Sequence, residues 1–403
     1  MPFSLTSSQG IKTAWGSMTK SKGSMIPFAK VVTDQISTEI YELIIDHLSD
    51  DKTSLVACNL VCRSWVPRSK MLLLQFLICR PVPLVSHGGF GSITCAIPAP
   101  DHPELREGGV IYGTTDGVYR GLPDGARPRL LSMPAVSQIE ILPDENLFLC
   151  LAGGEFITIP LGTVTSGACQ DADITRLSKH VSVFTVYRPT VAGESRRVCV
   201  LKSSSLSTTI KVFDVTGNHQ VSTLVNVQES YIPRETCSIR FLSRTRIAVA
   251  IKAGGSTLPG GFEVVDLVTL ETQSLLDPGD PSLEFAFRKV KPVVVFRVFG
   301  TFLVCYDKFA FYIDRNGRMA RDRQVMRWTL PANGFALHLP YILAFCNARV
   351  EVWNLETAEM VQKVQSKHQS PYHLLNTPES GDRVLHLLAF SGDVAEMVFK
   401  DAL

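Results

Sequence analysis

Short apolar runs separated by turn residues dominate the sequence from residue 85 onward, and they constrain the fold more than any other feature. Residues 302–306 and 309–313 show an alternation of side chains with a period of two, and the Asn316-Gly317 pair follows the second run. This alternation predicts β-strands, and Asn-Gly favours the positive φ of tight hairpin turns. Such runs return about every ten residues without any helical period between them. The sequence therefore predicts a long series of antiparallel hairpins.

The length of this β region limits the architectures that it can form. Residues 85–400 number 316, and strands at this spacing over such a length leave a sandwich or a propeller. The radial repetition of a propeller extends to this length, and roughly 45 residues per four-stranded blade gives about seven blades. The repeats carry no WD or kelch motif, so periodicity alone leaves the blade count open. We expect a mainly β protein with a β-propeller over residues 91–400.

A helical period replaces the strand pattern between residues 36 and 78. Ser37 is suited to cap a first helix. Its apolar stripe, spaced i, i+3, i+4 and i+8, consists of Ile40, Leu43, Ile44 and Leu48. Two further short helices are expected in the stretch that runs through Trp65. Three helices of this size make a small core, which usually needs a partner for stability. The alternative is a helical cap on the large domain. We expect a helical module over 34–80 and a Pro- and Gly-marked linker over 81–90.

The helical segment ISTEIYELIIDHLSDDKTSLVACNLVCRSWVPRSKMLLLQFLI resembles an F-box, in the style common in fungal proteins. The resemblance rests on EIYELIIDHL, on LVACNLVCRSW and on the spacing between them. F-boxes usually open with Leu-Pro, whereas this sequence has Ile36-Ser37. The resemblance implies docking of an apolar helix face to the Skp-type adaptor of a cullin-RING ubiquitin ligase. The contact residues that it implies are Ile36, Ile40, Leu43, Ile44, Leu48, Leu60, Val61, Cys62 and Trp65.

Segments of the β region resemble, in collinear order, the citron homology (CNH) domain. GVIYGTTDGVYRG and VSQIEILPDENLFLCLAGGEFITIPL are similar to its opening, FEVVDLVTLETQSLLDP and FGTFLVCYDKFAFYIDRNG to its middle, and LPYILAFCNARVEVWNLETAEMVQ to its end. The similarity is strongest to the CNH domain of fungal Rho-type guanine nucleotide exchange factors. It implies a propeller of about seven blades, here preceded by the small three-helix F-box module. It also implies protein partners such as small GTPases or their regulators.

The charge balance argues against broad binding to nucleic acid. Lys and Arg number 40 against 38 Asp and Glu, which gives a formal net charge of +2, whereas charge-driven binding to nucleic acid needs a clustered basic excess. Two interpretations stay open for a set of cations in the middle of the chain: a basic face for an acidic GTPase surface, or charged protection of solvated strand edges. These cations are Lys202, Lys211, Arg240, Arg244 and Arg246.

The cysteines indicate a reducing compartment rather than a metal site. The 10 cysteines are scattered, and only Cys58 and Cys62 fall at i, i+4, with no further His or Cys spaced to complete a tetrahedral set. We therefore expect no metal and no cofactor. Free cysteines of this kind suit the cytoplasm, with the nucleus as the alternative.

The N-terminus and the apolar runs bear on targeting. The first 33 residues contain four Lys and no Asp, Glu or Arg. We expect a disordered leader over residues 1–33, and a mitochondrial presequence, usually rich in Arg, is the alternative. No apolar run reaches the ~20 residues that span a bilayer, so no transmembrane segment is expected.

The sequence shows no pattern typical of a catalytic site. GxSxG, HExxH and P-loop motifs are all missing from it. No exchange-catalysing or pleckstrin-type domain separates the helical segment from the β region. We therefore predict that the chain is not an enzyme and has no exchange activity. The leading hypothesis is a non-catalytic substrate-receptor subunit of a cullin-RING ubiquitin ligase, in which the propeller binds a protein substrate. The alternative is a CNH scaffold in Rho-type small-GTPase signalling or vesicle trafficking.

Overall fold

A computed structural model gives the structure of the chain, and two compact units divide it, Met1–Leu77 and Ile78–Leu403. Each unit is described by itself. The residues that the structure describes are 43–48, 53–54, 57, 78–85, 91–105, 109–189, 194–217, 222–253, 260–298, 300–320, 324–347, 349–365, 372–376, 383–388 and 393–399.

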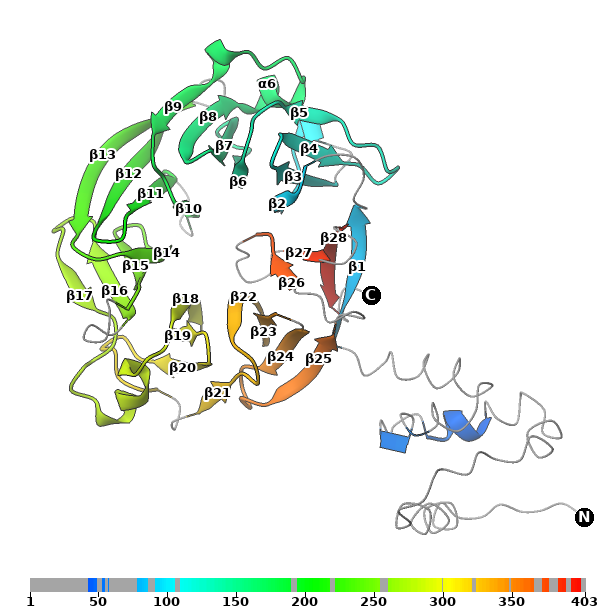
Figure 1. Cartoon of the computed structure of the whole chain (residues 1–403), viewed down its shortest axis with the longest axis vertical. Coiled ribbons are helices and arrows are strands. Elements are labelled where there is room, and N and C mark those ends of the chain that lie inside the picture. The colour runs from blue at the N-terminus through cyan, green and yellow to red at the C-terminus, as the bar shows by residue number, and fades with distance from the viewer. Residues whose placement is uncertain are drawn as a thin grey trace, which may run out of the picture. The chain divides into compact units, whose positions relative to one another are not determined.

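The second unit is a ring of seven four-stranded antiparallel sheets, which we call blades 1 to 7 (Figure 1). Blade 1 contains β2 (Ile93–Pro98), β3 (Val110–Thr114), β4 (Val118–Gly121) and β5 (Arg129–Leu131). Blade 2 contains β6 (Val136–Leu142), β7 (Leu147–Ala152), β8 (Glu155–Pro160) and β9 (Thr175–Ser178). Blade 3 contains β10 (Val183–Tyr187), β11 (Arg197–Ser203), β12 (Thr208–Gly217) and β13 (Ser222–Ile232).

Blade 4 contains β14 (Thr236–Ser243), β15 (Arg246–Ile251), β16 (Gly261–Asp266) and β17 (Thr272–Ser274). Blade 5 contains β18 (Pro292–Val298), β19 (Thr301–Tyr306), β20 (Phe309–Ile313) and β21 (Val325–Arg327). Blade 6 contains β22 (Ala332–His338), β23 (Tyr341–Cys346), β24 (Arg349–Asn354) and β25 (Met360–Gln365). Blade 7 contains β26 (Tyr372–Leu374), β27 (Val384–Leu388), β28 (Asp393–Phe399) and β1 (Cys79–Val85).

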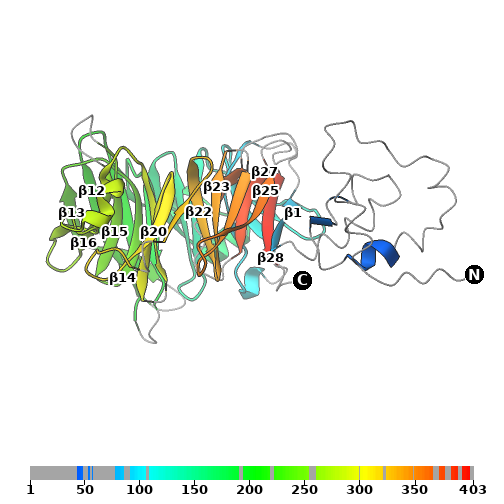
Figure 2. The same ribbon diagram turned by 90° about the horizontal axis from the view of Figure 1, so that it is seen from below.

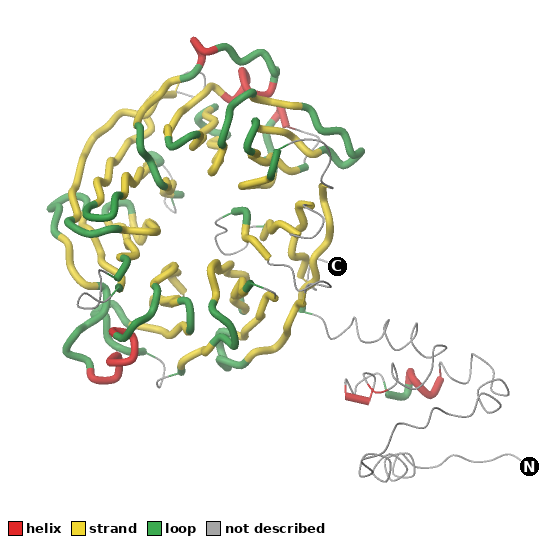
Figure 3. Tube along the Cα trace, viewed as in Figure 1, coloured by secondary structure: helices red, strands yellow, loops and turns green. Residues whose placement is uncertain are grey.

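The blades stand side by side around the ring, with the first strand of each nearest the centre (Figures 1 and 2). The described helical turns of this unit lie on the outer rim (Figure 3). They are η1 (Pro103–Leu105), α6 (Leu161–Thr165), η2 (Asp171–Asp173) and η3 (Pro281–Phe287). The prediction of a mainly β, seven-bladed propeller is therefore confirmed. Among the described residues, no helix has the length and apolar character needed to cross a membrane.

Blade 7 closes the ring by combining the two ends of the β region. β1 pairs with β28 over the register from Cys79↔Phe399 to Val85↔Val394. The side chain of Gln362 in blade 6 binds this strand, because its amide oxygen accepts from Cys79 N at 3.1 Å and its nitrogen donates to Cys79 O at 2.6 Å. The linker expected over 81–90 overlaps β1, so the propeller begins with this strand and not at residue 91.

The core lies between neighbouring blades. β7 is buried at all six positions and β20 at all five, because each blade is covered on both faces of its sheet. The alternation expected for 309–313 thus separates two buried faces and not a buried face from a solvated one. Aromatic rings join the blades: Phe156 and Phe184 lie 5.0 Å apart between blades 2 and 3. These contacts make the ring one rigid support for the loops at its ends.

Only a small part of the first unit is described. Residues 43–46 are helical, as expected, with Ile45 fully buried and the Leu43 side chain 69% exposed. Ile44 and Leu48 are half-buried. The leader over 1–33 lies outside the described residues, as do most of the adaptor contacts named from the sequence, namely Ile36, Ile40, Leu60, Val61, Cys62 and Trp65.

Candidate protein-binding surfaces

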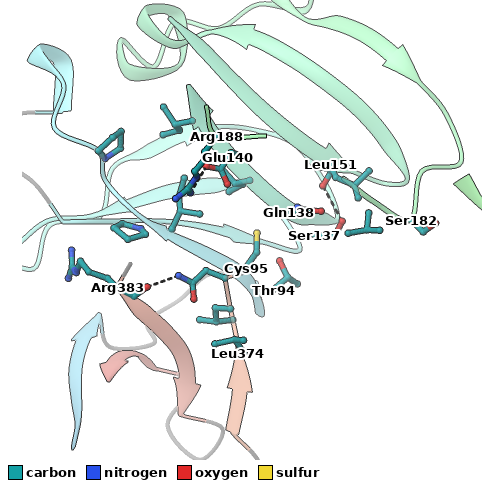
Figure 4. A pocket seen from close by; sticks show the side chains of 18 residues that line it. Thr94, Cys95, Ser137, Gln138, Glu140, Leu151, Ser182, Arg188, Leu374 and Arg383 are labelled. Atoms are coloured by element: carbon teal, nitrogen blue, oxygen red, sulfur yellow. Dashed lines mark hydrogen bonds and ion pairs between the residues drawn. The ribbon is translucent and has the colours of Figure 1, made fainter. Parts of the chain in front are cut away.

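A cavity of about 590 Å³ opens beside the first strands of blades 7, 1, 2 and 3 (Figure 4). Its wall carries polar side chains from each of these strands or from the turns at their ends. They include Thr94, Ser137, Gln138, Arg188, Asn376 and Arg383. Thr94 lies on β2, and Ser137 and Gln138 are consecutive residues of β6.

Three of these six side chains, Thr94, Gln138 and Arg188, form hydrogen bonds to a neighbouring blade. Gln138 bridges blades 2 and 3, since its Nε2 donates to Phe184 O at 2.7 Å and its Oε1 accepts from Phe184 N at 3.0 Å. Thr94 Oγ1 donates to Gly113 O at 3.1 Å and also to Val136 O in blade 2. Gln138 and Thr94 are therefore engaged in hydrogen bonds that join neighbouring blades, which stabilises the ring.

Two ion pairs also line the cavity. Arg188 Nη2 donates to Glu140 Oε1 at 3.2 Å. Arg383 is bidentate to Glu396 over 2.8 and 2.6 Å. The hydrogen bond to Glu396 is the main cause of a raised pKa of the Arg383 guanidinium, against a smaller lowering by burial. Both arginines are thus engaged with carboxylates of the chain itself.

Two arginines at the start of β11 form ion pairs, one with blade 2 and one within blade 3. Arg196 donates to Asp144 at 2.7 Å and to Glu145 at 2.8 Å, both in the β6–β7 turn of blade 2. Arg197 Nε donates to Asp214 Oδ1 at 2.6 Å within blade 3. Arg196, Glu145, Arg197 and Asp214 are half-buried, whereas Asp144 is exposed, and the Arg196 pairs tie blade 3 to the β6–β7 turn.

The cations that the sequence offered as a basic face are spread over two blades. They lie on β11, β12, β14, β15 and the β14–β15 turn: Lys202, Lys211, Arg240, Arg244 and Arg246. Lys211 pairs with Glu229 at 3.3 Å and Arg246 with Asp266 at 3.2 Å. The structure therefore does not gather them into one unpaired basic face.

A buried carboxylate joins blade 6 to the link that precedes it. Glu351 is fully buried, and its Oε2 accepts from Thr329 N at 3.2 Å and from Trp353 Nε1 at 3.3 Å. Arg349 Nε lies 3.0 Å from Glu351 Oε1. Sequence reasoning missed this network, because a Glu within an apolar strand gives no sign of which partners will reach it.

The thiols of the propeller behave as small apolar side chains. Burial raises the pKa of Cys79, Cys95 and Cys346 to about 12, so all three are protonated near neutral pH. No cluster of His, Cys, Asp and Glu suited to a metal ion occurs within the described part of the chain. The Cys58 and Cys62 pair lies outside the described residues.

The fold and its closure define a seven-bladed propeller. Residues 107–374 match the CNH domain family, and this span is more than half of the 403 residues. The chain belongs to the CNH domain family.

Individual proteins support the same assignment. The chain is 36% identical over 284 residues to Rho1 guanine nucleotide exchange factor 1 of Schizosaccharomyces pombe, covering 64% of this chain and 20% of the relative. It is 28% identical over 255 residues to RHO1 GDP-GTP exchange protein 2 of Saccharomyces cerevisiae, covering 59% of this chain and 18% of the relative. The solved AfRom2 CNH domain superimposes with a TM-score of 0.66 and 31% identity, covering 79% of this chain and 99% of that structure.

The match continues into protein kinases. Serine/threonine-protein kinase Genghis Khan of Drosophila melanogaster is 23% identical over 289 residues, which cover 66% of this chain and 16% of the kinase. The chain spans about a fifth of the length of the curated relatives it matches. The activities of those whole proteins therefore do not transfer directly to this chain.

Two functional predictions are corrected by these relatives. The role as a substrate receptor of a cullin-RING ubiquitin ligase is wrong, because the similar proteins are Rho1 exchange factors. The prediction that the chain is not an enzyme is also contradicted. It rested on the absence of catalytic motifs, whereas relatives that share this domain are named exchange factors and kinases. The F-box assignment of the helical segment rests on its sequence alone.

Proposed function

We propose that the propeller binds a Rho-type GTPase and serves as a scaffold in Rho-type GTPase signalling. The observation that carries this proposal is the 36% identity over 284 residues with an S. pombe Rho1 exchange factor. The solved AfRom2 CNH domain supports it, because 99% of that domain is covered by this propeller.

The physical features of the ring suit this role. Closure by β1 and the aromatic contacts between blades join the blades into one ring. A rigid surface loses little conformational entropy on binding, so contacts to a folded partner convert more fully into affinity. A standard protein interface takes about 800 Å² from each partner, which one end of such a ring can supply.

Affinity capture tests the proposal. The whole chain is immobilised and exposed to a set of purified Rho-type GTPases, each loaded with GDP or with a non-hydrolysable GTP analogue. We expect retention of at least one Rho-type protein, with Ras-type and Rab-type GTPases in the flow-through. Equal retention of all three types would contradict the proposal, and so would a blank across the Rho-type set.

The adaptor-binding role of residues 34–80 stays a separate prediction. It is favoured by the 69% exposure of the apolar Leu43 side chain on a helical turn. Co-purification with a Skp-type adaptor tests it: the Leu43→Asp/Ile44→Asp variant should lose the adaptor, because an unpaired charge would enter the apolar contact. Failure of the wild-type chain to retain the adaptor removes the prediction and leaves the propeller's role untouched.

A further inference from the structure

The link between blades 4 and 5 is unusual among the described connections of the ring. It runs over residues 275–291 and is 17 residues long, whereas the links 132–135, 179–182, 233–235 and 328–331 have three or four residues. The link is packed onto the propeller and contains η3. Its apolar residues Leu276, Leu283 and Ala286 are buried. An insertion held in one conformation on a rigid support is a common place for partner recognition.

The acidic residues of this link are occupied in holding it in place. Asp280 caps η3, since its Oδ1 accepts from Ser282 N at 2.9 Å and its Oδ2 accepts from Met319 N at 2.9 Å. Asp277 Oδ2 accepts from Arg318 Nε at 3.0 Å. Glu284 lies 3.4 Å from Arg288 on the exposed side of η3. The carboxylates of Asp277, Asp280 and Glu284 are therefore engaged elsewhere and do not neutralise Lys289 and Lys291 at the end of the link.

Four cationic side chains gather at the end of blade 5 where the link enters. They form what we call the blade 5 basic patch: Lys289, Lys291, Lys308 and Arg327. Lys308 Nζ donates to Lys289 O at 3.4 Å, and the Asp307 N–H donates to Lys291 O at 2.9 Å. Register pairing sets Arg327 opposite Phe309, the residue after Lys308. Three separate segments thus bring their cations to one end of one blade.

The patch is exposed and carries excess positive charge. All four side chains are exposed, and none of them forms an ion pair with an acidic side chain among the described residues. The acidic group beside them is Asp307, whose carboxylate accepts from the Lys291 N–H at 2.9 Å. Carboxylates on a partner would therefore meet cations that form no ion pair within the described part of the chain.

Apolar groups accompany the cations. The Arg327 guanidinium lies 5.8 Å from the ring centroid of Phe285 in the link and 6.0 Å from that of Phe309. Leu330, in the link to blade 6, is 38% exposed, and the exposed Pro331 follows it. Cations held over rings, with apolar side chains beside them, match a folded protein surface with fixed carboxylates better than a fluid layer of lipid headgroups.

We propose that the blade 5 basic patch is the docking surface for an acidic surface of a protein partner. The partner expected at this surface is the Rho-type GTPase, so this inference rests on the proposed function. Charges at the rim of an interface act mainly on the association rate. Salt screens these charges, because the Debye length falls from ~10 Å at 0.1 M to ~3 Å at 1 M ionic strength, so binding should weaken as salt is added.

The test compares two triple variants of the whole chain with equal change of charge. The patch variant is Lys289→Glu/Lys291→Glu/Lys308→Glu. The control variant is Arg80→Glu/Lys179→Glu/Lys363→Glu, which reverses three exposed cations on blade 7, in the link 179–182 and on blade 6. Circular dichroism confirms that each variant is folded. Dissociation constants are then measured for GTP- and GDP-loaded Rho-type GTPases, for a Glu-rich peptide and for phosphatidylserine vesicles.

We expect binding of the GTPase and of the Glu-rich peptide to weaken at least tenfold in the patch variant and by less than twofold in the control variant. If the wild-type chain binds the peptide through the patch but no GTPase, the proposed function fails and the docking surface stands. If the patch variant binds the GTPase and the peptide as the wild type does, the docking surface is overturned and the proposed function stands. Loss of vesicle binding alone, or no peptide or GTPase binding by the wild type, also overturns the docking surface.

Discussion

His386 occupies the middle of β27, where both of its ring nitrogens are buried. Neither nitrogen has a hydrogen-bond partner among the described residues, and the ring lies 5.5 Å from that of Tyr372 and 6.1 Å from that of Phe345. Burial lowers the pKa of His386 from 6.5 to about 4. The imidazole is therefore neutral in the folded protein under physiological conditions, and its role is apolar packing.

This lowered pKa predicts a loss of stability in mild acid. Below pH 6.5 the unfolded chain binds a proton at His386 that the folded chain excludes down to about pH 4. Stability therefore falls across this window, by about 2 kcal/mol at pH 5 relative to pH 7.5 from this residue. Urea unfolding at both pH values measures it.

The His386→Phe variant should lack this part of the pH dependence. The matched control is His373→Phe, which changes an exposed histidine on the neighbouring strand β26. The control should retain the wild-type difference between the two pH values. A wild-type difference that persists in His386→Phe would show that other groups cause it.

Replacing Glu351 should lower the free energy of unfolding. Glu351→Gln removes the charge that faces Arg349 and weakens the bonds from Thr329 and Trp353. We expect a loss of about 3 kcal/mol in the free energy of unfolding, because breaking a buried pair leaves the other charge uncompensated. Urea titration at pH 7.5 measures it. Glu351→Gln/Arg349→Met should recover part of the loss, and a double variant weaker than the single one would contradict this account.

Turn residues are where sequence and structure agree best at this scale. Asp266 Oδ1 accepts from Val268 N at 2.9 Å, and Asp314 Oδ1 accepts from Asn316 N at 2.8 Å. Short polar side chains bond their own backbone two residues on, so the sequence alone predicts their structural role. The partner of Gln362 lies in blade 7, and Thr329, a partner of Glu351, lies in the link before blade 6, so local sequence patterns do not indicate either contact.

At the scale of elements, β1 shows why the start of the ring could not be placed from the sequence. Pro81 and Pro83 made this segment resemble a linker, since proline cannot donate to a strand ladder. β1 is the outermost strand of blade 7, where one side has no neighbouring strand and proline is tolerated. Its partner β28 lies more than 300 residues further along the chain, beyond the reach of any local pattern.

The closure by β1 predicts a local effect of Gln362. Gln362→Leu removes the amide that serves Cys79 N and Cys79 O, and an unsatisfied buried backbone group costs about 1–3 kcal/mol. Hydrogen exchange should therefore accelerate in β1 and β28 while blades 3 and 4 keep their protection. Gln365→Leu, at an exposed position of the same strand β25, is the control. Uniform acceleration across all blades would argue against a local role in closure.

At the scale of the whole molecule, the propeller carries the functional assignment. The match to Rho1 exchange factors extends over 284 residues, whereas the ligase hypothesis rested on the short helical segment 36–78. The strand period and the collinear CNH-like segments were enough to predict the architecture. The surface charge pattern was not predictable, because the blade 5 basic patch joins residues from three separate segments.

Isothermal titration of the whole chain with a Rho-type GTPase is the most direct test of the central claim, that this CNH propeller binds such a GTPase. We predict saturable binding to at least one nucleotide-loaded form, with an affinity that weakens as the salt concentration rises. Absence of saturable binding to every Rho-type GTPase of the source cell, in both the GDP-loaded and the GTP-loaded form, would contradict the claim.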